Sequence, residues 1–178
     1  MRITIFGGAS CKAEDPVYQQ AYQLGKFLAE HNHIILTGGY VGVMEASSRG
    51  AAEAGGHVIG VTCDEIEHWR PITANPWVKE VRQFSTLRER LWDLLANSDV
   101  AIAMPGGIGT LAEIAMLWNH LIIRSLPVKG LIIIGEGWKN VFDVFFRDLG
   151  MFIHEEDQRN IHFVADIAGA EQKILSLQ

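Results

Sequence analysis

Short apolar runs rich in Val and Ile alternate with longer segments of helical periodicity along this chain. We expect strands at Arg2–Phe6, His33–Thr37, His57–Val61, Val78–Phe84, Val100–Met104, Gly130–Ile134 and Ile161–Val164. We expect helices near Pro16–His31, Val43–Ala54, Leu87–Ala96, Leu111–Ile123, Lys139–Leu149 and Ile167–Leu177. Continuous apolar runs are typical of strands that are buried on both faces of a parallel sheet. The alternation therefore predicts an α/β fold: a Rossmann-like, doubly wound, mostly parallel sheet of about seven strands with helices on both faces.

Local signals support several of these boundaries. Asp15 before Pro16 is a good helix N-cap, and Thr86 with Glu89 forms a capping-box pattern. Gly55 and Gly56 are placed to end the second helix. The segment Asp64–Asn75 is the least regular, and we expect a loop over a pocket or a subunit contact there.

Size and composition exclude several classes of protein. The 178 residues show no interdomain linker, so we expect a single domain over residues 1–178. The formal net charge of −6 and the lack of a basic stripe argue against a nucleic-acid partner. Apolar runs such as Leu131–Ile134 are too short to cross a bilayer, so we expect no membrane association. Two cysteines and a start that leads directly into a strand predict a cytoplasmic protein without a signal peptide.

Three glycine-rich turns follow the first, second and fifth predicted strands. In a doubly wound sheet, ligands bind beyond the carboxyl ends of the strands, where these turns would lie. Glycines and the free N–H groups of a helix start can hold a phosphate closely. We therefore expect substrate or phosphate contacts from Gly8, Ser10, Gly38, Gly39, Gly106, Gly107, Ile108, Gly109 and Thr110.

The same turns lack the patterns of the common nucleotide cofactor sites. None is followed by the Gly-Lys-Ser/Thr of a Walker A loop. The first turn also lacks the third glycine and the downstream acid of a dinucleotide-binding site. His31 and His33 do not have a helical metal-ligand spacing. We therefore expect neither a cofactor nor a metal.

Glu113 has two interpretations. With Thr110 it completes a capping-box pattern, and the local pattern by itself favours this structural role. Alternatively, its carboxylate stands beside the predicted anion site. There it could act as a general base on water or stabilise an oxocarbenium-like transition state.

Arg88 and Arg90 lie in the first turns of the helix that precedes the third glycine turn. They are about 200° apart around the helix axis, so they cannot do the same job. Arg90 has Leu87 and Leu94 as neighbours and lies near the buried face of the helix. A guanidinium at the rim of a cleft can bind phosphate or hydroxyl groups, whereas an arbitrary arginine is more often solvated. Helical geometry alone does not choose between the two arginines.

The segment Pro105–Glu113, Pro-Gly-Gly-x-Gly-Thr-x-x-Glu, resembles the signature of the LOG family of nucleoside monophosphate phosphoribohydrolases. The likeness extends to Phe6–Ser10, to the turn Thr37–Met44 and to Leu126–Gly130. It implies hydrolysis of the N-glycosidic bond of a nucleoside 5′-monophosphate to free base and ribose 5-phosphate. The family's catalytic residues fall on Glu113 and Arg90, and its phosphate-binding turn falls on residues 106–110. The resemblance also implies a homodimer, or a higher homo-oligomer, with each pocket close to the partner subunit.

The chain departs from the family pattern at three positions. Leu91 stands where the family has lysine, Arg88 where histidine is usual, and Ala112 where glutamate is frequent. The alternative interpretation is a non-catalytic protein that binds or carries a nucleotide or the molybdenum cofactor, as in the molybdenum-cofactor carrier proteins of this fold.

Overall fold

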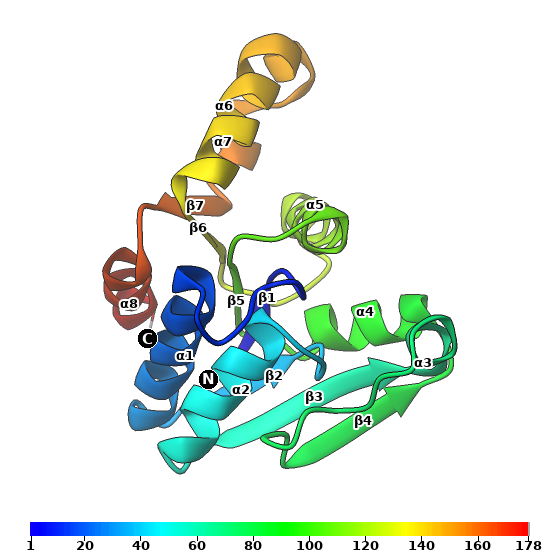
Figure 1. The fold of residues 1–178 in the computed structure, drawn as a ribbon. Helices are drawn as coiled ribbons and strands as arrows, with labels where there is room; N and C mark the ends of the chain where they lie inside the picture. Colours follow the sequence, from blue (N-terminus) through cyan, green and yellow to red (C-terminus); the bar gives the residue numbers. More distant parts are fainter. Residues whose placement is uncertain (178) are drawn as a thin grey trace.

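The structure of the protein, a computed structural model, describes residues 1–177. Within these residues seven strands form one parallel sheet in the order β4-β3-β2-β1-β5-β6-β7 (Figure 1). The strands are β1 (Arg2–Phe6), β2 (Ile34–Thr37), β3 (His57–Cys63), β4 (Glu80–Phe84), β5 (Val100–Ala103), β6 (Leu131–Ile134) and β7 (Ile161–Val164). The predicted doubly wound α/β sheet is confirmed.

Helices connect successive strands and lie on both sides of the sheet (Figure 1). They are α1 (Pro16–Glu30), α2 (Val43–Glu53), α3 (Asp64–Trp69), α4 (Leu87–Ala96), α5 (Ile108–Ile122), α6 (Glu136–Leu149), the 3₁₀ turn η1 (Gly150–Phe152), α7 (Glu155–Gln158) and α8 (Ile167–Ser176). In the part of the chain that the structure describes, no helix combines the length and the apolar character needed to cross a bilayer.

Two apolar cores lie on opposite faces of the sheet. One contains side chains of α1, α2 and α8, and the other contains side chains of α4, α5 and α6. Successive strand residues alternate between these cores: Ile3 and Ile5 of β1 join the first, and Phe6 joins the second. Val100 of β5 likewise joins the first core, and Ala101 joins the second. This period-2 alternation between two covered faces explains why the strands are apolar without interruption.

Strand β1 is the point where the chain reverses its direction across the sheet. After β1 the chain builds β2, β3 and β4 on one side, and then it returns to place β5 on the other side. In the register, Ile5 lies beside Thr37 of β2, and Phe6 lies beside Ala103 of β5. The three glycine turns therefore leave the same edge of the sheet side by side, at the switch point where open α/β sheets bind ligands.

The local boundary signals have different outcomes. The capping box of α4 is present, since Thr86 Oγ1 accepts a hydrogen bond from Glu89 N and the Glu89 carboxylate accepts one from Thr86 N. Gly55, with a φ of +80°, follows the last turn of α2 as expected. Asp15 occupies the N-cap position of α1, but its carboxylate accepts from Lys12 N instead of capping the helix.

The irregular segment after β3 is not a plain loop. Its first six residues form α3, and the short helix α7 and the turn η1 were also missed by the sequence pattern. These elements are too short to show a helical period, so periodicity cannot detect them.

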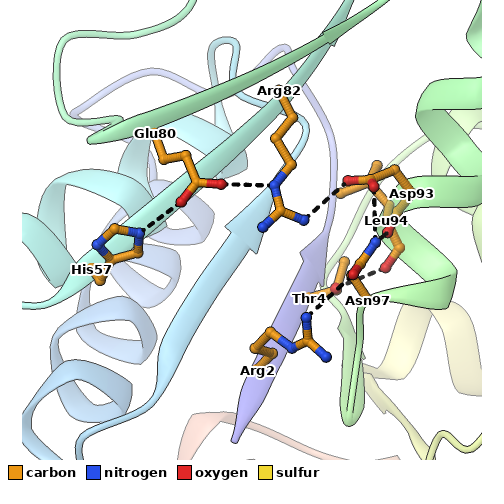
Figure 2. A network of polar contacts seen from close by, with 8 residues as sticks. All are labelled: Arg2, Thr4, His57, Glu80, Arg82, Asp93, Leu94 and Asn97. Carbon is orange, nitrogen blue, oxygen red and sulfur yellow. Dashed lines mark hydrogen bonds and ion pairs between the residues drawn. The ribbon is translucent and has the colours of Figure 1, made fainter.

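A chain of polar contacts joins β3, β4 and α4 to β1 (Figure 2). Its members in order are His57, Glu80, Arg82, Asp93, Asn97 and Arg2. The link between strand and helix is the contact of Arg82 Nη1 with Asp93 Oδ2 at 3.6 Å. At the C-terminal end of α4, Asn97 Nδ2 donates to Asp93 Oδ1 over 2.8 Å. These contacts hold α4 in place on the sheet.

Candidate active site

Two of the glycine turns are joined by backbone hydrogen bonds through a third. Gly8 N donates to Pro105 O over 3.0 Å, and Gly8 O accepts from Val43 N over 2.9 Å. A Cβ on Gly106 would lie 2.8 Å from Gly8 N, so only glycine permits this close approach. The turns after β1, β2 and β5 therefore form one connected backbone surface at the carboxyl edge of the sheet.

The amino terminus of α5 opens from this surface to solvent. The helix begins at Ile108 with Gly107 as its N-cap, and residues 106–109 are exposed. The first N–H groups of a helix have no partner within the helix and carry partial positive charge. The exposed turn can therefore hold an anion such as a phosphate.

The early start of α5 corrects one sequence interpretation. We expected the helix from Leu111, with Thr110 as its cap and Glu113 closing a capping box. Instead Thr110 lies inside the first turn, is buried, and Gly107 occupies the N-cap position. Glu113 is in the second turn and cannot cap the helix. Glycine residues 106, 107 and 109 hid the true start, because they carry no helical pattern.

Arg90 closes the first turn of α4 and is buried beneath the carboxyl ends of β2 and β3. Its Nε donates to Val61 O over 2.8 Å, and its Nη2 donates to Gly38 O over 3.2 Å. The guanidinium carbon lies 5.5 Å from the centre of the Tyr40 ring. A guanidinium has five N–H donors, and these two bonds use two of them. Arg90 is therefore held rigidly while it keeps donors for a ligand.

The carboxyl group of Glu113 in α5 interacts electrostatically with the Arg90 guanidinium. Burial raises the pKa of Glu113 to about 7, and the positive charge of Arg90 offsets part of that increase. The carboxyl side chain is half-buried, so it keeps some access to solvent. A carboxyl group with a pKa near 7 can both accept and release a proton at neutral pH.

The second glycine turn forms the seat of Arg90. Gly38 and Gly39 are buried, and a Cβ on Gly38 would overlap the Arg90 guanidinium. Gly39 has a φ of +79°, a conformation that favours glycine. Both predicted residues thus belong to the turn that contacts Arg90, and the carbonyl oxygen of Gly38 accepts its hydrogen bond.

Ser10 and Arg88 are exposed, whereas Arg90 is buried and Glu113 is half-buried. Ser10 is exposed and lines a neighbouring cavity of about 410 Å³ together with Lys12 and Arg70. Arg88 is exposed and lines a cleft of about 480 Å³ with Trp92 of α4 and other side chains. The burial of Arg90 and the exposure of Arg88 distinguish the two arginines, between which helical geometry alone did not choose.

Two further residues shape the site and were missed by the sequence pattern. The Tyr40 hydroxyl donates to Cys63 O, and Tyr40 also flanks Arg90. Asn75, between α3 and β4, donates from Nδ2 to the carbonyl oxygens of Gly39 and Tyr40.

Leu91, at the family's lysine position, packs against the apolar core beneath α4 and α5. Among residues 1–177, no group of three or more His, Cys, Asp and Glu side chains could hold a metal ion.

Comparison with known proteins places this arrangement in a family. The model of the SLOG cluster4 family matches residues 1–123, which include every predicted site residue. A relative from Oryza sativa subsp. japonica, named cytokinin riboside 5′-monophosphate phosphoribohydrolase LOG, is 34% identical over 99% of this chain and 72% of its own length.

Two solved structures match this chain over almost its full length and over almost their own full length. The molybdenum cofactor carrier protein of Chlamydomonas reinhardtii has a TM-score of 0.74 and 27% identity, covering 99% of this chain and 96% of its own. The molybdenum cofactor binding protein of Rippkaea orientalis has a TM-score of 0.75 and 25% identity, with the same coverage. The match to the family model and the identity to the rice relative show that this chain belongs to the LOG family.

Proposed function

We propose that the protein hydrolyses the N-glycosidic bond of a nucleoside 5′-monophosphate, releasing the free base and ribose 5-phosphate. One observation carries this proposal: an exposed helix start that can bind an anion belongs to the same helix as Glu113, a carboxyl group coupled to the buried Arg90. The rice relative is named for this reaction on a cytokinin riboside 5′-monophosphate.

The residues would divide the reaction between them. The backbone N–H groups at the start of α5 would bind the 5′-phosphate and so fix the ribose near Glu113. The ionised Glu113 would stabilise positive charge on the ribose and take a proton from the attacking water, whose oxygen bonds to the anomeric carbon. As the glycosidic C–N bond breaks, its electron pair leaves with the base, which then takes up a proton. Arg90 would position the substrate and support departure of the base.

Replacing Glu113 tests this role directly. Glu113→Gln keeps the size of the side chain and removes its charge. We expect base release from AMP, GMP, CMP or UMP, followed by chromatography, to fall by about a hundredfold or more. Glu136→Gln, which removes an exposed carboxyl from the first turn of α6, is the matched control and should keep wild-type activity. Wild-type rates in Glu113→Gln would exclude the catalytic role.

The alternative candidate function is that of a carrier protein, which binds its ligand without catalysing a reaction. It is favoured by the two solved structures of proteins that carry or bind the molybdenum cofactor, which match 99% of this chain. Leu91 in place of the family's lysine is consistent with that function, because the position offers no charge. Calorimetry on the same nucleotides separates the two proposals. Tight binding of a nucleotide without any release of base would favour the carrier.

We also propose that the protein acts as a homodimer in the cytoplasm. The large apolar side chains Leu87 and Trp92 of α4 and Met116 of α5 are exposed, and so is Ile123 directly after α5. Trp92 and Met116 line the same cleft, and large exposed apolar side chains that lie together are typical of a protein–protein interface. Trp92 and Met116 lie on the two helices that carry Arg90 and Glu113, so a partner subunit there would lie close to the proposed site.

A further inference from the structure

We propose that Asn75 is a positioning residue for Arg90: it fixes the turn Gly38–Tyr40 on which the Arg90 guanidinium rests. The catalytic consequence of this proposal rests on the proposed hydrolase function. The positioning itself does not, because it concerns the geometry of the unliganded protein.

The seat of Arg90 depends largely on one short turn. Gly38 supplies the carbonyl that accepts from Nη2, and Tyr40 supplies the ring beside the guanidinium. The remaining contact, from Nε to Val61 O, involves the more regular strand β3. Any movement of the turn would thus remove two of these three contacts.

The turn needs outside support to hold this shape. It follows the last residue of β2, and its centre, Gly39, has a φ of +79°. Carbonyl groups buried in such a turn must find donors, because an unpaired buried carbonyl costs about 1–3 kcal/mol. The donors come from Asn75, which lies 36 positions further along the chain.

Asn75 uses its backbone and its side chain for this task. Its Nδ2 donates to Gly39 O over 3.0 Å and to Tyr40 O over 2.8 Å, and its backbone N donates to Gly39 O over 2.8 Å. Its Oδ1 accepts from Trp77 N over 3.2 Å, which fixes the orientation of the amide. The residue is only 7% exposed. A planar group with two donors and one acceptor is required here, and the side-chain amide supplies it.

The chemistry of the amide predicts what its loss would do. Without Nδ2, the carbonyls of Gly39 and Tyr40 lose side-chain donors, and the turn relaxes toward other partners or water. Arg90 then loses its fixed position, and its positive charge is no longer held at a constant place relative to Glu113. Since Arg90 lowers the pKa of Glu113, a displaced Arg90 would let that pKa rise above its present value of about 7.

The test of positioning uses the unliganded protein and the NMR signal of the Arg90 Nε–H group, assigned by its loss in Arg90→Lys. In Asn75→Ala we expect this signal to shift and its exchange with water to accelerate about tenfold or more. Asn75→Asp keeps the side-chain volume and removes both donors, so it should show the same change if Asn75→Ala does not fold. Ser98→Ala removes a different buried hydrogen bond, from Ser98 Oγ to Val100 O, and should leave the signal unchanged.

An unchanged Arg90 signal in folded Asn75→Ala or Asn75→Asp would overturn the proposal, whether or not the protein is a hydrolase. An equal change in Ser98→Ala would overturn it as well, because the effect would then reflect general loss of stability.

Kinetics tests the catalytic consequence where wild-type protein releases base. We expect Asn75→Ala to lower kcat about tenfold to a hundredfold with little change in KM. We also expect the rise of kcat with pH to shift to higher pH, because the pKa of Glu113 would increase. In an Arg90→Lys background the same substitution should have almost no further effect on kcat. A full additional loss in that background would show that Asn75 does not act through Arg90. If wild-type protein releases no base, the proposed function fails, and the NMR result still decides the positioning role.

Discussion

Glu113 illustrates how burial changes the chemistry of a single residue. Desolvation raises its pKa from the ordinary 4.5 to about 7, although the positive charge of Arg90 acts to lower it. Between these two pH values the unfolded chain has lost the proton that the folded chain still holds. Folding therefore becomes less favourable as the pH rises through this window, and the penalty is complete above pH 7.

We predict that Glu113→Gln stabilises the protein at pH 8 relative to wild type. The gain should be about 1–3 kcal/mol larger at pH 8 than at pH 4, because the neutral amide escapes the desolvation cost of the carboxylate. Urea unfolding of both proteins across this pH range measures the difference. Glu136→Gln serves as the control for loss of an exposed carboxyl. A Glu113→Gln difference that stays constant from pH 4 to 8 would contradict a raised pKa.

Arg88 and Arg90 show what residue-level sequence patterns leave open. Their angular separation on the helix could be worked out from the sequence, and so could the nearness of Arg90 to the buried face. The partners of Arg90 could not, because Val61 and Gly38 are 29 and 52 positions away from it in the chain. Only the assembled strands bring these carbonyl groups beneath α4.

At the scale of elements, the contact between Arg82 and Asp93 joins α4 to strand β4, in addition to the packing of α4 in the apolar core (Figure 2). Asp93 Oδ2 is buried and accepts no hydrogen bond from residues 1–177, so Arg82 is its source of compensating charge. A buried charge that loses its partner destabilises a fold more than an exposed one does. Because α4 carries Arg90, this contact also supports the geometry of the site.

We predict that Arg82→Met lowers the free energy of unfolding by about 1–3 kcal/mol. Adding Asp93→Asn should restore part of this loss, since the uncompensated charge is then removed. Arg147→Met breaks the exposed pair with Asp148 and should change stability by less than about 0.5 kcal/mol. Denaturant unfolding of the single and double variants gives the coupling. Similar losses in Arg82→Met and Arg147→Met would argue against a special role for Asp93.

The elements also differ in how well the sequence predicts them. Strands β1 and β7 and helix α4 have the predicted bounds, because each has a clear apolar period and distinct flanking residues. Helix α5 begins three residues before the predicted start, since Ile108 and Gly109 give no helical signal. That shift removed the capping interpretation of Glu113, so an error at one helix end changed a functional assignment.

At the scale of the whole molecule, the exposed apolar surface of α4 and α5 motivates the proposed homodimer. Trp92 is 47% exposed and lines the cleft of about 480 Å³ with Met116 and His120 of α5. The centre of its ring lies 5.4 Å from the centre of the His120 ring, in an edge-to-face arrangement. A side chain of this size on an open face buries considerable area when a second copy covers it.

We predict that Trp92→Glu converts a dimer into a monomer, because the interface would have to bury a charge. Light scattering after size-exclusion chromatography measures the mass in solution. Phe152→Glu, a similar change at an exposed residue of η1, is the control and should leave the mass unchanged. A dimer that persists in Trp92→Glu, or a wild-type monomer, would show that α4 and α5 do not form the interface.

The sequence by itself determined the alternation of the seven strands with the longer helices, the parallel α/β architecture and the edge of the sheet where the glycine turns lie. These features follow from short-range periodicity and from the connection rules of parallel sheets, so neighbouring residues suffice to encode them. The tertiary structure alone decided that Arg90 is the buried arginine, that Glu113 has a pKa of about 7, and that Asn75 supports the turn after β2. Burial, charge coupling and side-chain hydrogen bonds join residues far apart in the chain, and they exist only once the sheet brings those residues together.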